Sequence, residues 1–216
     1  MKVLANGDGL SPFLPGPAKG PIKETGALMY DFAWRFALKW EGGLTDDPKD
    51  PGGITKYGVD YRMLSDMARD SKTKAFLRDL GVQLPVTRDT IKALTIPQAK
   101  AIYKYKYWDP LECGRFPLPV ACCLFDAGML NGMNSVKFMQ RAHNVLKPKS
   151  PLVVDGKLGP KTRAALLTDD ANELARIAIE KREYWFRSHV KVVPGHKKFL
   201  NGWLNRCADL RKTLGL

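Results

Sequence analysis

The residues best suited to acid–base chemistry lie between positions 41 and 57. Glu41 falls at the end of a predicted helix, where the negative end of the helix dipole and the neighbouring Trp40 both favour a protonated, neutral acid. Farther along, Asp50 lies in a turn rich in Pro and Gly, where backbone N–H groups and solvent keep a carboxylate ionised. Thr55 offers a hydroxyl that can hold a water molecule. Two carboxylates in such different surroundings are the minimum for hydrolysis of a glycosidic bond, in which one donates a proton and the other activates water.

A helix and a hairpin must hold these groups. Apolar residues recur with the helical period over residues 28–40, and Gly42 and Gly43 then end the helix. Residues 44–59 read as a short β-hairpin or loop. A Glu before two glycines can also be only a solvated helix end, and Asp-Pro-Gly-Gly only a turn. The spacing alone leaves both interpretations open.

The rest of the chain is predicted to be almost entirely helical. Lys-Pro-Lys-Ser-Pro at 147–151 marks a boundary between two parts. The sequence therefore predicts a mainly α fold, namely a helical bundle with one small β-hairpin, followed by a C-terminal helical subdomain. The predicted divisions are an N-terminal arm over 1–24, a first domain over 25–146 and a second over 147–216. Helices are predicted from a cap at Thr25 to about residue 40, at about 60–80, 96–107, 118–130 and 134–146, just after Gly159-Pro160, from Asp169 to about 188, and at about 195–213.

Composition narrows the class of protein. The chain has 216 residues, of which 44% are hydrophobic, and 35 Lys and Arg against 22 Asp and Glu give a net charge of +13. Such a surface attracts polyanions, whether nucleic acid, anionic lipid or the bacterial cell wall. No apolar run approaches the roughly 20 residues that span a bilayer, and the first residues do not predict a cleaved signal peptide.

Neither a metal nor a cofactor is expected. The three histidines have no ligand spacing, and no nucleotide-binding motif is present. The four cysteines include no CxxC pair and are predicted to be reduced core thiols, namely Cys113, Cys122, Cys123 and Cys207.

The region around Glu41 resembles glycoside hydrolase family 108, the N-acetylmuramidases of phage endolysins and their bacterial relatives. The resemblance is carried by EGGL at 41–44 with DDPKDPGGITKYGV at 46–59, and it continues in YWDPL at 107–111 and FDAGMLNG at 125–132. Leu44 stands where the family usually has Tyr. The resemblance implies an α+β lysozyme-like fold.

The resemblance also suggests roles for site residues. Glu41 matches the essential acid of the family motif, and by analogy with phage-type lysozymes Asp50 and Thr55 take the second and third catalytic roles. Asp47 is a rival to Asp50 for the second carboxylate. The predicted substrate-binding residues are Asp47, Tyr57, Trp108 and Asn131. Asn131 could hydrogen-bond an N-acetyl group or could only cap the end of its helix.

The C-terminal part is similar to small helical peptidoglycan-binding domains. VDGKLGPKTRAAL at 154–166 is similar to their Asp-Gly-x-x-Gly-Pro-x-Thr pattern, and GWLNR at 202–206 resembles their Gly-Trp-x-x-Arg ending. Asp155-Gly156 predicts a tight turn and Pro160 the first turn of a helix. The pattern leaves open whether this part binds cell wall on its own or only completes the fold.

The expected function is that of a peptidoglycan hydrolase, an endolysin that cleaves the β-1,4 bond between N-acetylmuramic acid and N-acetylglucosamine during cell lysis. The expected partners are peptidoglycan and a holin-type membrane protein, and a monomer is expected. The enzyme would accumulate in the host cytoplasm and act at the wall after release. The alternatives are a non-enzymatic peptidoglycan-binding or assembly protein, a lytic transglycosylase and, on charge alone, a nucleic-acid binder.

Overall fold

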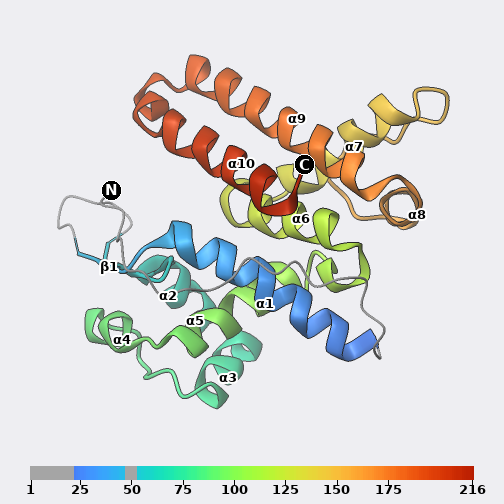
Figure 1. Cartoon of the computed structure of the whole chain (residues 1–216). Helices are drawn as coiled ribbons and strands as arrows, with labels where there is room; N and C mark the ends of the chain where they lie inside the picture. The colour runs from blue at the N-terminus through green and yellow to red at the C-terminus, as the bar shows by residue number, and fades with distance from the viewer. Residues whose placement is uncertain (1–21, 47–52) are drawn as a thin grey trace.

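The computed structural model describes residues 22–46 and 53–216, drawn in colour in Figure 1. Within them the fold is mainly α with one small antiparallel sheet, as the sequence predicts. Asp47, Asp50 and residues 1–21 of the predicted N-terminal arm lie outside the described residues, whereas residues 22–24 of that arm belong to the first helix. No helix in the described part of the chain is long and apolar enough to cross a membrane.

Helix α1 (Ile22–Glu41) leads directly to the candidate acid. Its apolar face is buried through Ala33, Trp34 and Ala37. The helix ends because Gly42 takes a left-handed conformation, with φ of 72°, which glycine adopts without steric cost. Ala37 and Trp34 lie about one and two turns before Glu41, so the acid is held at the end of a helix that is fixed in the core.

The sheet beside α1 has three short strands, one more than the predicted hairpin. Strands β1 (Leu44–Thr45), β2 (Thr55–Lys56) and β3 (Val59–Asp60) pair antiparallel in chain order. Tyr57 and Gly58 join β2 to β3, with φ of 52° and 77°. Two positive φ values in a two-residue loop are those of a type I′ turn, whose twist matches that of paired strands.

Several stretches differ from the predicted helices. Helix α1 already begins at Ile22, so Thr25 lies inside it and is not its cap. The helix predicted over 60–80 is two helices, because the Asp70 side chain accepts a hydrogen bond from the backbone N–H of Thr73 and starts a new helix. A short helix, α4, also begins at a capping box on Thr87 that was not predicted from the sequence.

The helical elements after the sheet are α2 (Tyr61–Arg69), α3 (Ser71–Asp79), α4 (Arg88–Ala93), α5 (Ile96–Tyr103), the π-helical η1 (Lys104–Trp108), the 3₁₀ turn η2 (Cys113–Arg115), α6 (Leu118–Asn131), α7 (Asn134–Leu146), α8 (Pro160–Thr168), α9 (Ala171–Val192), the 3₁₀ turn η3 (Pro194–Phe199) and α10 (Leu200–Leu214).

Helix α6 forms the centre of the molecule. It contacts α1 on one side and α7 and α9 on the other, and Figure 1 shows it between α1 and the pair α9 and α10. It is buried on all sides over residues 120–128, including Phe125 at 0% exposure. The four cysteines are free and buried, as predicted, and burial raises the pKa of each thiol, that of Cys207 to about 11. One core therefore connects the two parts of the chain.

Candidate active site

Three elements meet at the side chain of Glu41: the end of α1, the β2–β3 turn and the end of α5. The Glu41 side chain is 19% exposed. A methyl group placed on Gly58 would lie 2.8 Å from Glu41 Oε2 and would overlap the hydroxyl of Tyr103. The glycine in the turn therefore permits a close approach between the backbone, the carboxylate and the tyrosine.

Two tyrosines near the same carboxylate carry hydroxyl groups that stay uncharged. Burial raises the pKa of Tyr103 well above its usual value, and the charge of Glu41 adds to the effect. The pKa of Tyr107 rises to about 12 through burial and through the charges of Asp60 and Glu41. Both hydroxyls therefore stay protonated near neutral pH and can act as hydrogen-bond donors in the site.

A cation from the other end of the chain completes the surroundings of Glu41. Arg206 of α10 donates from Nη1 to Glu41 Oε1 at 2.7 Å, and from Nε to Asp126 Oδ1 at 2.8 Å. Its Nη2 lies 2.7 Å from the same Asp126 oxygen as an ion pair that lacks hydrogen-bond geometry. The sequence analysis assigned no role to either Arg206 or Asp126, although both belong to motifs that carried the resemblance.

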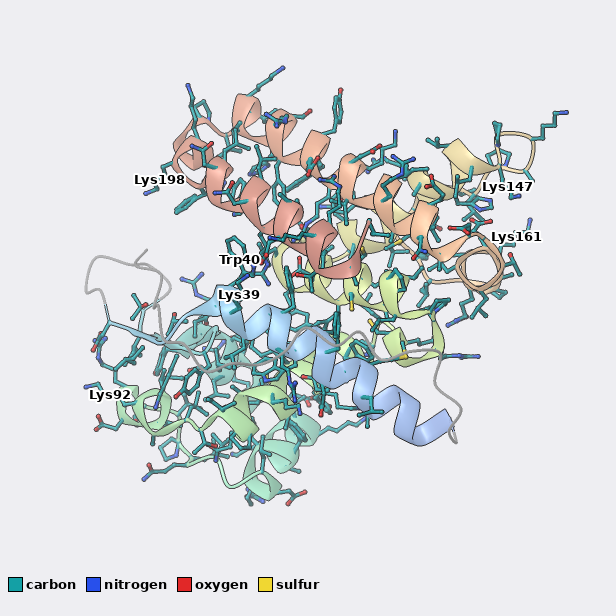
Figure 2. The ribbon with its side chains drawn as sticks, in the orientation of Figure 1. Lys39, Trp40, Lys92, Lys147, Lys161 and Lys198 are labelled. Atoms are coloured by element: carbon teal, nitrogen blue, oxygen red, sulfur yellow. The ribbon has the colours of Figure 1, made fainter. Side chains whose placement is uncertain are left out.

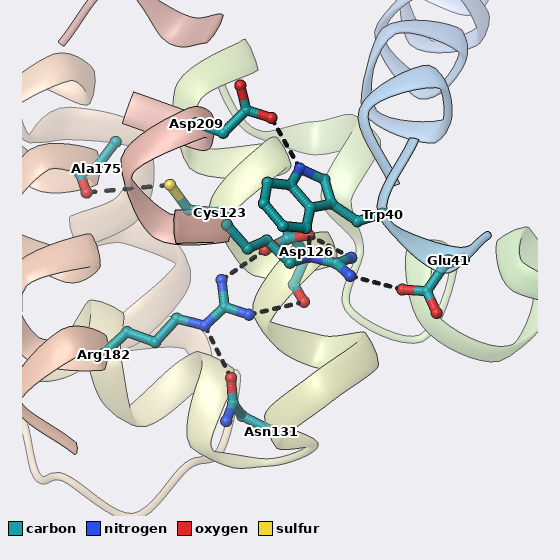
Figure 3. A network of polar contacts seen from close by, with 9 residues as sticks. Trp40, Glu41, Cys123, Asp126, Asn131, Ala175, Arg182 and Asp209 are labelled. Atoms are coloured by element: carbon teal, nitrogen blue, oxygen red, sulfur yellow. Dashed lines mark hydrogen bonds and ion pairs between the residues drawn. The ribbon is translucent and has the colours of Figure 1, made fainter. Parts of the chain in front are cut away.

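The network continues behind Asp126 (Figure 3). Arg182 of α9 donates from Nη1 to Asp126 Oδ2 at 2.5 Å and from Nε to Asn131 Oδ1 at 2.9 Å. Burial alone would raise the pKa of Asp126, but Arg206 and Arg182 outweigh burial and hold that pKa below its usual range. Asp126 is therefore an ionised carboxylate in the core, held between two arginines.

The surroundings of Glu41 differ from those predicted. The sequence analysis expected Trp40 to create an apolar environment, but the Trp40 indole donates from Nε1 to Asp209 Oδ2 of α10 at 2.8 Å. The charged group that pairs with Glu41 in the described part of the chain is the Arg206 guanidinium. The acid thus faces a cation instead of an apolar wall.

Two other predicted site residues, Thr55 and Tyr57, belong to strand β2 and to the turn that follows it, where Gly58 approaches Glu41. Thr55 is half-buried in β2, where it pairs with Thr45 and Asp60. Tyr57 directly precedes Gly58, and the Lys56 ammonium lies 5.3 Å from the centre of its ring. Asp47 and Asp50 fall outside the described residues, so their roles stay predictions.

Trp108 requires a correction, because its position is incompatible with stacking on a sugar. It is 3% exposed and its ring packs against Tyr30 and Phe125, with ring centres 5.1 and 5.6 Å away. The π-helical turn of η1 brings this indole into the core. Asn131 is half-buried, and its side-chain oxygen is used to hold Arg182.

The Asp-Gly pattern of the C-terminal part forms the predicted tight turn. Gly156 has φ of 78°, and its N–H donates to Gln140 Oε1 at 2.9 Å. Gln140 Nε2 in turn donates to Asp155 Oδ1 at 2.8 Å. Pro160 lies in the first turn of α8 as predicted. The pattern is thus explained by local structure.

No metal centre is apparent near these groups: residues 22–46 and 53–216 hold no cluster of three or more His, Cys, Asp or Glu side chains that could bind an ion. The groups that the structure brings together at Glu41 are a carboxylate, two protonated phenols and a guanidinium. These groups can donate, accept and stabilise a proton without a cofactor.

Comparison with known proteins places this site within a family. Residues 34–132 match the glycosyl hydrolase 108 model, and residues 134–208 match a model described as a predicted peptidoglycan domain. The chain also resembles a solved structure, SagA of Brucella abortus, with a TM-score of 0.67 and 26% sequence identity over 88% of this chain and 95% of that chain. No curated protein matches the chain.

The first match contains Glu41, Gly58, Tyr103 and Asp126, and the second contains Arg182 and Arg206. The second match begins at the first residue of α7, thirteen residues before the boundary that the Lys-Pro-Lys-Ser-Pro segment predicts. Residues 34–132 therefore belong to glycosyl hydrolase family 108 and residues 134–208 to the predicted peptidoglycan domain family, which makes this chain a glycoside hydrolase of peptidoglycan.

Proposed function

We propose that the enzyme is an N-acetylmuramidase that hydrolyses the β-1,4 bond between N-acetylmuramic acid and N-acetylglucosamine. The observation that carries the proposal is the partly exposed Glu41 carboxylate at the end of α1, inside the glycosyl hydrolase match and beside the protonated hydroxyl of Tyr103. A carboxyl group so placed can be reached by a polymer from outside while its own position is fixed by the core.

Glu41 acts as the general acid. It protonates the glycosidic oxygen as the bond to the sugar breaks, and the carboxylate that results faces Arg206 Nη1, so the negative charge forms next to a fixed cation. Asp50, with Thr55, positions and activates water on the opposite face of the sugar. This arrangement inverts the configuration at the anomeric carbon.

The test is the variant E41Q, which keeps the size of the side chain and removes its acidic proton. We expect at least a ~100-fold lower release of reducing ends from purified sacculi, with an unchanged circular dichroism spectrum. Mass spectrometry of borohydride-reduced products should show reduced muramic acid ends in the wild-type digest. Full activity of E41Q would contradict the assignment of the acid.

The same digest distinguishes the alternative functions. Anhydro-muramic acid ends would indicate a lytic transglycosylase, and retention on sacculi without any new ends would indicate a non-enzymatic wall-binding or assembly protein. NMR of the first anomer released tests the stereochemistry. A retained anomer would make Asp50 a nucleophile.

We further propose an endolysin role. The monomeric enzyme would be made in the cytoplasm and released to the wall by a holin-type membrane partner. Its positive charge would favour the anionic wall, and lysines project from both parts of the molecule, among them Lys92, Lys147 and Lys198 (Figure 2). Expression in a bacterial host should leave cells intact until the membrane is permeabilised with chloroform, and lysis should then follow within minutes. Lysis without permeabilisation would contradict the need for a membrane partner.

A further inference from the structure

Arg206 joins the two acidic side chains that lie closest to it, and it does so from the second domain. Its guanidinium binds Glu41 through Nη1 and Asp126 through Nε and Nη2. The residue is 5% exposed, whereas Asp126 is 1% exposed. A buried arginine in this arrangement cannot rotate away without leaving Glu41 without this cation and Asp126 with Arg182 alone.

We infer that Arg206 is a positioning residue for Glu41, so that α10 of the peptidoglycan domain completes the catalytic centre of the hydrolase domain. The inference rests on the proposed function, because it takes Glu41 to be the acid. It assigns the second domain a part in catalysis in addition to any contact with the wall.

The position of Arg206 is itself fixed by its neighbours. Asp126 holds the Nε side of the guanidinium, and Arg182 holds the other oxygen of Asp126 at 2.5 Å. Asn131 holds Arg182 in turn. The planar guanidinium suits this task because its N–H groups point in fixed directions, which a lysine ammonium cannot reproduce. Glu41 Oε1 is thereby tied to the central helix α6.

The charge of Arg206 also acts directly on the site. Among the described residues, the titratable and charged groups that face Glu41 are Arg206 on α10, Tyr103 at the end of α5 and Tyr107 on η1, with Asp60 on β3 and Asp126 on α6 behind them. The two phenols are neutral, so the guanidinium is the cation of this group. A variant that removes this cation should move the alkaline limb of the activity profile to higher pH.

The experiment measures release of reducing ends from sacculi between pH 4 and 9 for the full-length wild type, R206Q, R206K and R211Q. We expect R206Q to be at least ~10-fold less active at its optimum, with the alkaline limb of its activity profile moved to higher pH. R206K keeps the charge but cannot span both acids, so we expect intermediate activity and an alkaline midpoint close to that of the wild type.

The matched control is R211Q. Arg211 lies on the same helix and pairs with Glu183 at 3.2 Å, away from the site, so the variant removes the same charge from α10. We expect its activity to stay within about twofold of the wild type with an unmoved profile. An equal shift in R211Q would show that net charge and binding to the wall cause the effect, and would overturn the inference.

Two further results would overturn it. One is a folded R206Q with an unmoved alkaline limb, because a merely structural residue lowers activity equally at every pH. The other is full activity of R206K, which also decides the matter if R206Q does not fold. An inactive wild type or an active E41Q is a failure of the proposed function itself, and the inference falls with it.

Discussion

Two of the buried polar clusters in the described part of the chain differ in the kind of group they use. The Arg206 cluster is made of full charges and joins residues 165 positions apart, from Glu41 to Arg206. The Gln140 cluster is centred on a neutral amide that is 1% exposed, and it holds only the nearby turn and the start of α8. Both lie between helices and both match motifs seen in the sequence.

The difference indicates what each cluster is for. An amide with all its partners satisfied fixes a turn at little cost, because no charge has to leave water. Burying Arg206, Asp126 and Arg182 costs desolvation that a well-packed apolar core would avoid. The charged cluster ends on the partly exposed Glu41, whereas the Gln140 cluster ends on the turn at Asp155–Lys157 and on Thr162. On the proposal that Glu41 is the acid, the costly cluster serves the chemistry and the inexpensive one serves the fold.

The largest effect is expected from D126N. The variant leaves Arg206 and Arg182 without their shared anion, and breaking a buried pair in this way costs about 3–5 kcal/mol of unfolding free energy. Activity should fall as well, because Arg206 loses its anchor. Urea unfolding and the sacculus assay measure the two effects. A loss of unfolding free energy below about 1 kcal/mol would mean that the charged cluster is no more costly to break than the Gln140 cluster.

The difference in unfolding free energy between wild type and D126N should depend on pH, because the pKa of Asp126 is lowered in the folded protein. Because the folded pKa lies below the unfolded value of about 3.9, the stabilisation is present above that value and is lost as the pH falls through the folded pKa. The gap in stability between wild type and D126N should therefore be constant near neutral pH and should narrow below about pH 4. A stability gap between wild type and D126N that widens on acidification would contradict the assignment of Asp126 as an ionised carboxylate.

A smaller effect is expected from Q140A. The variant leaves the N–H of Gly156 without its partner in a buried turn and removes the hydrogen bonds from Nε2, at a cost of about 1–3 kcal/mol. Specific activity measured well below the melting temperature should stay within twofold of the wild type. A large loss of activity in a folded Q140A would mean that this cluster also acts on the site.

The last prediction, for G58A, concerns activity more than stability. A side chain at φ of 77° costs about 1 kcal/mol, and relief of the overlap with Tyr103 and Glu41 adds to that cost. The added methyl would displace the Glu41 carboxylate and the Tyr103 hydroxyl, so activity should fall at least ~10-fold. The matched control is G81A, which has φ of 73° and only an ordinary contact, 3.9 Å from Gln98. G81A should lose only the backbone cost and keep its activity.

Local patterns in the sequence predicted most of the fold. The end of α1 at Gly42, the start of α8 at Pro160 and the turn at Gly156 each depend on a few adjacent residues, and the structure confirms them. The helix predicted over 60–80 was wrong because its apolar period continues through Asp70, where a side-chain cap outweighs periodicity.

The site was harder to predict because it depends on contacts between distant residues. Trp108 was assigned to a groove because its type suits sugars, but a π-helical turn that the periodicity does not reveal places it in the core. Arg206 ends the Gly-Trp-x-x-Arg motif and Asp126 follows Phe125 in another motif, so a signal was present. The sequence alone does not show that these two motifs meet at Glu41 in the folded protein.

The separation of Glu41 from Arg206 along the chain has a consequence for biosynthesis. During translation the ribosome adds Glu41 to the chain 165 residues before it adds Arg206, with which Glu41 pairs. Until α10 has emerged and docked, the nascent polypeptide carries a glutamate without its guanidinium partner. If Arg206 positions the acid, a product cut short before α10 would lack that positioning and would remain a poor hydrolase even after its release to the wall.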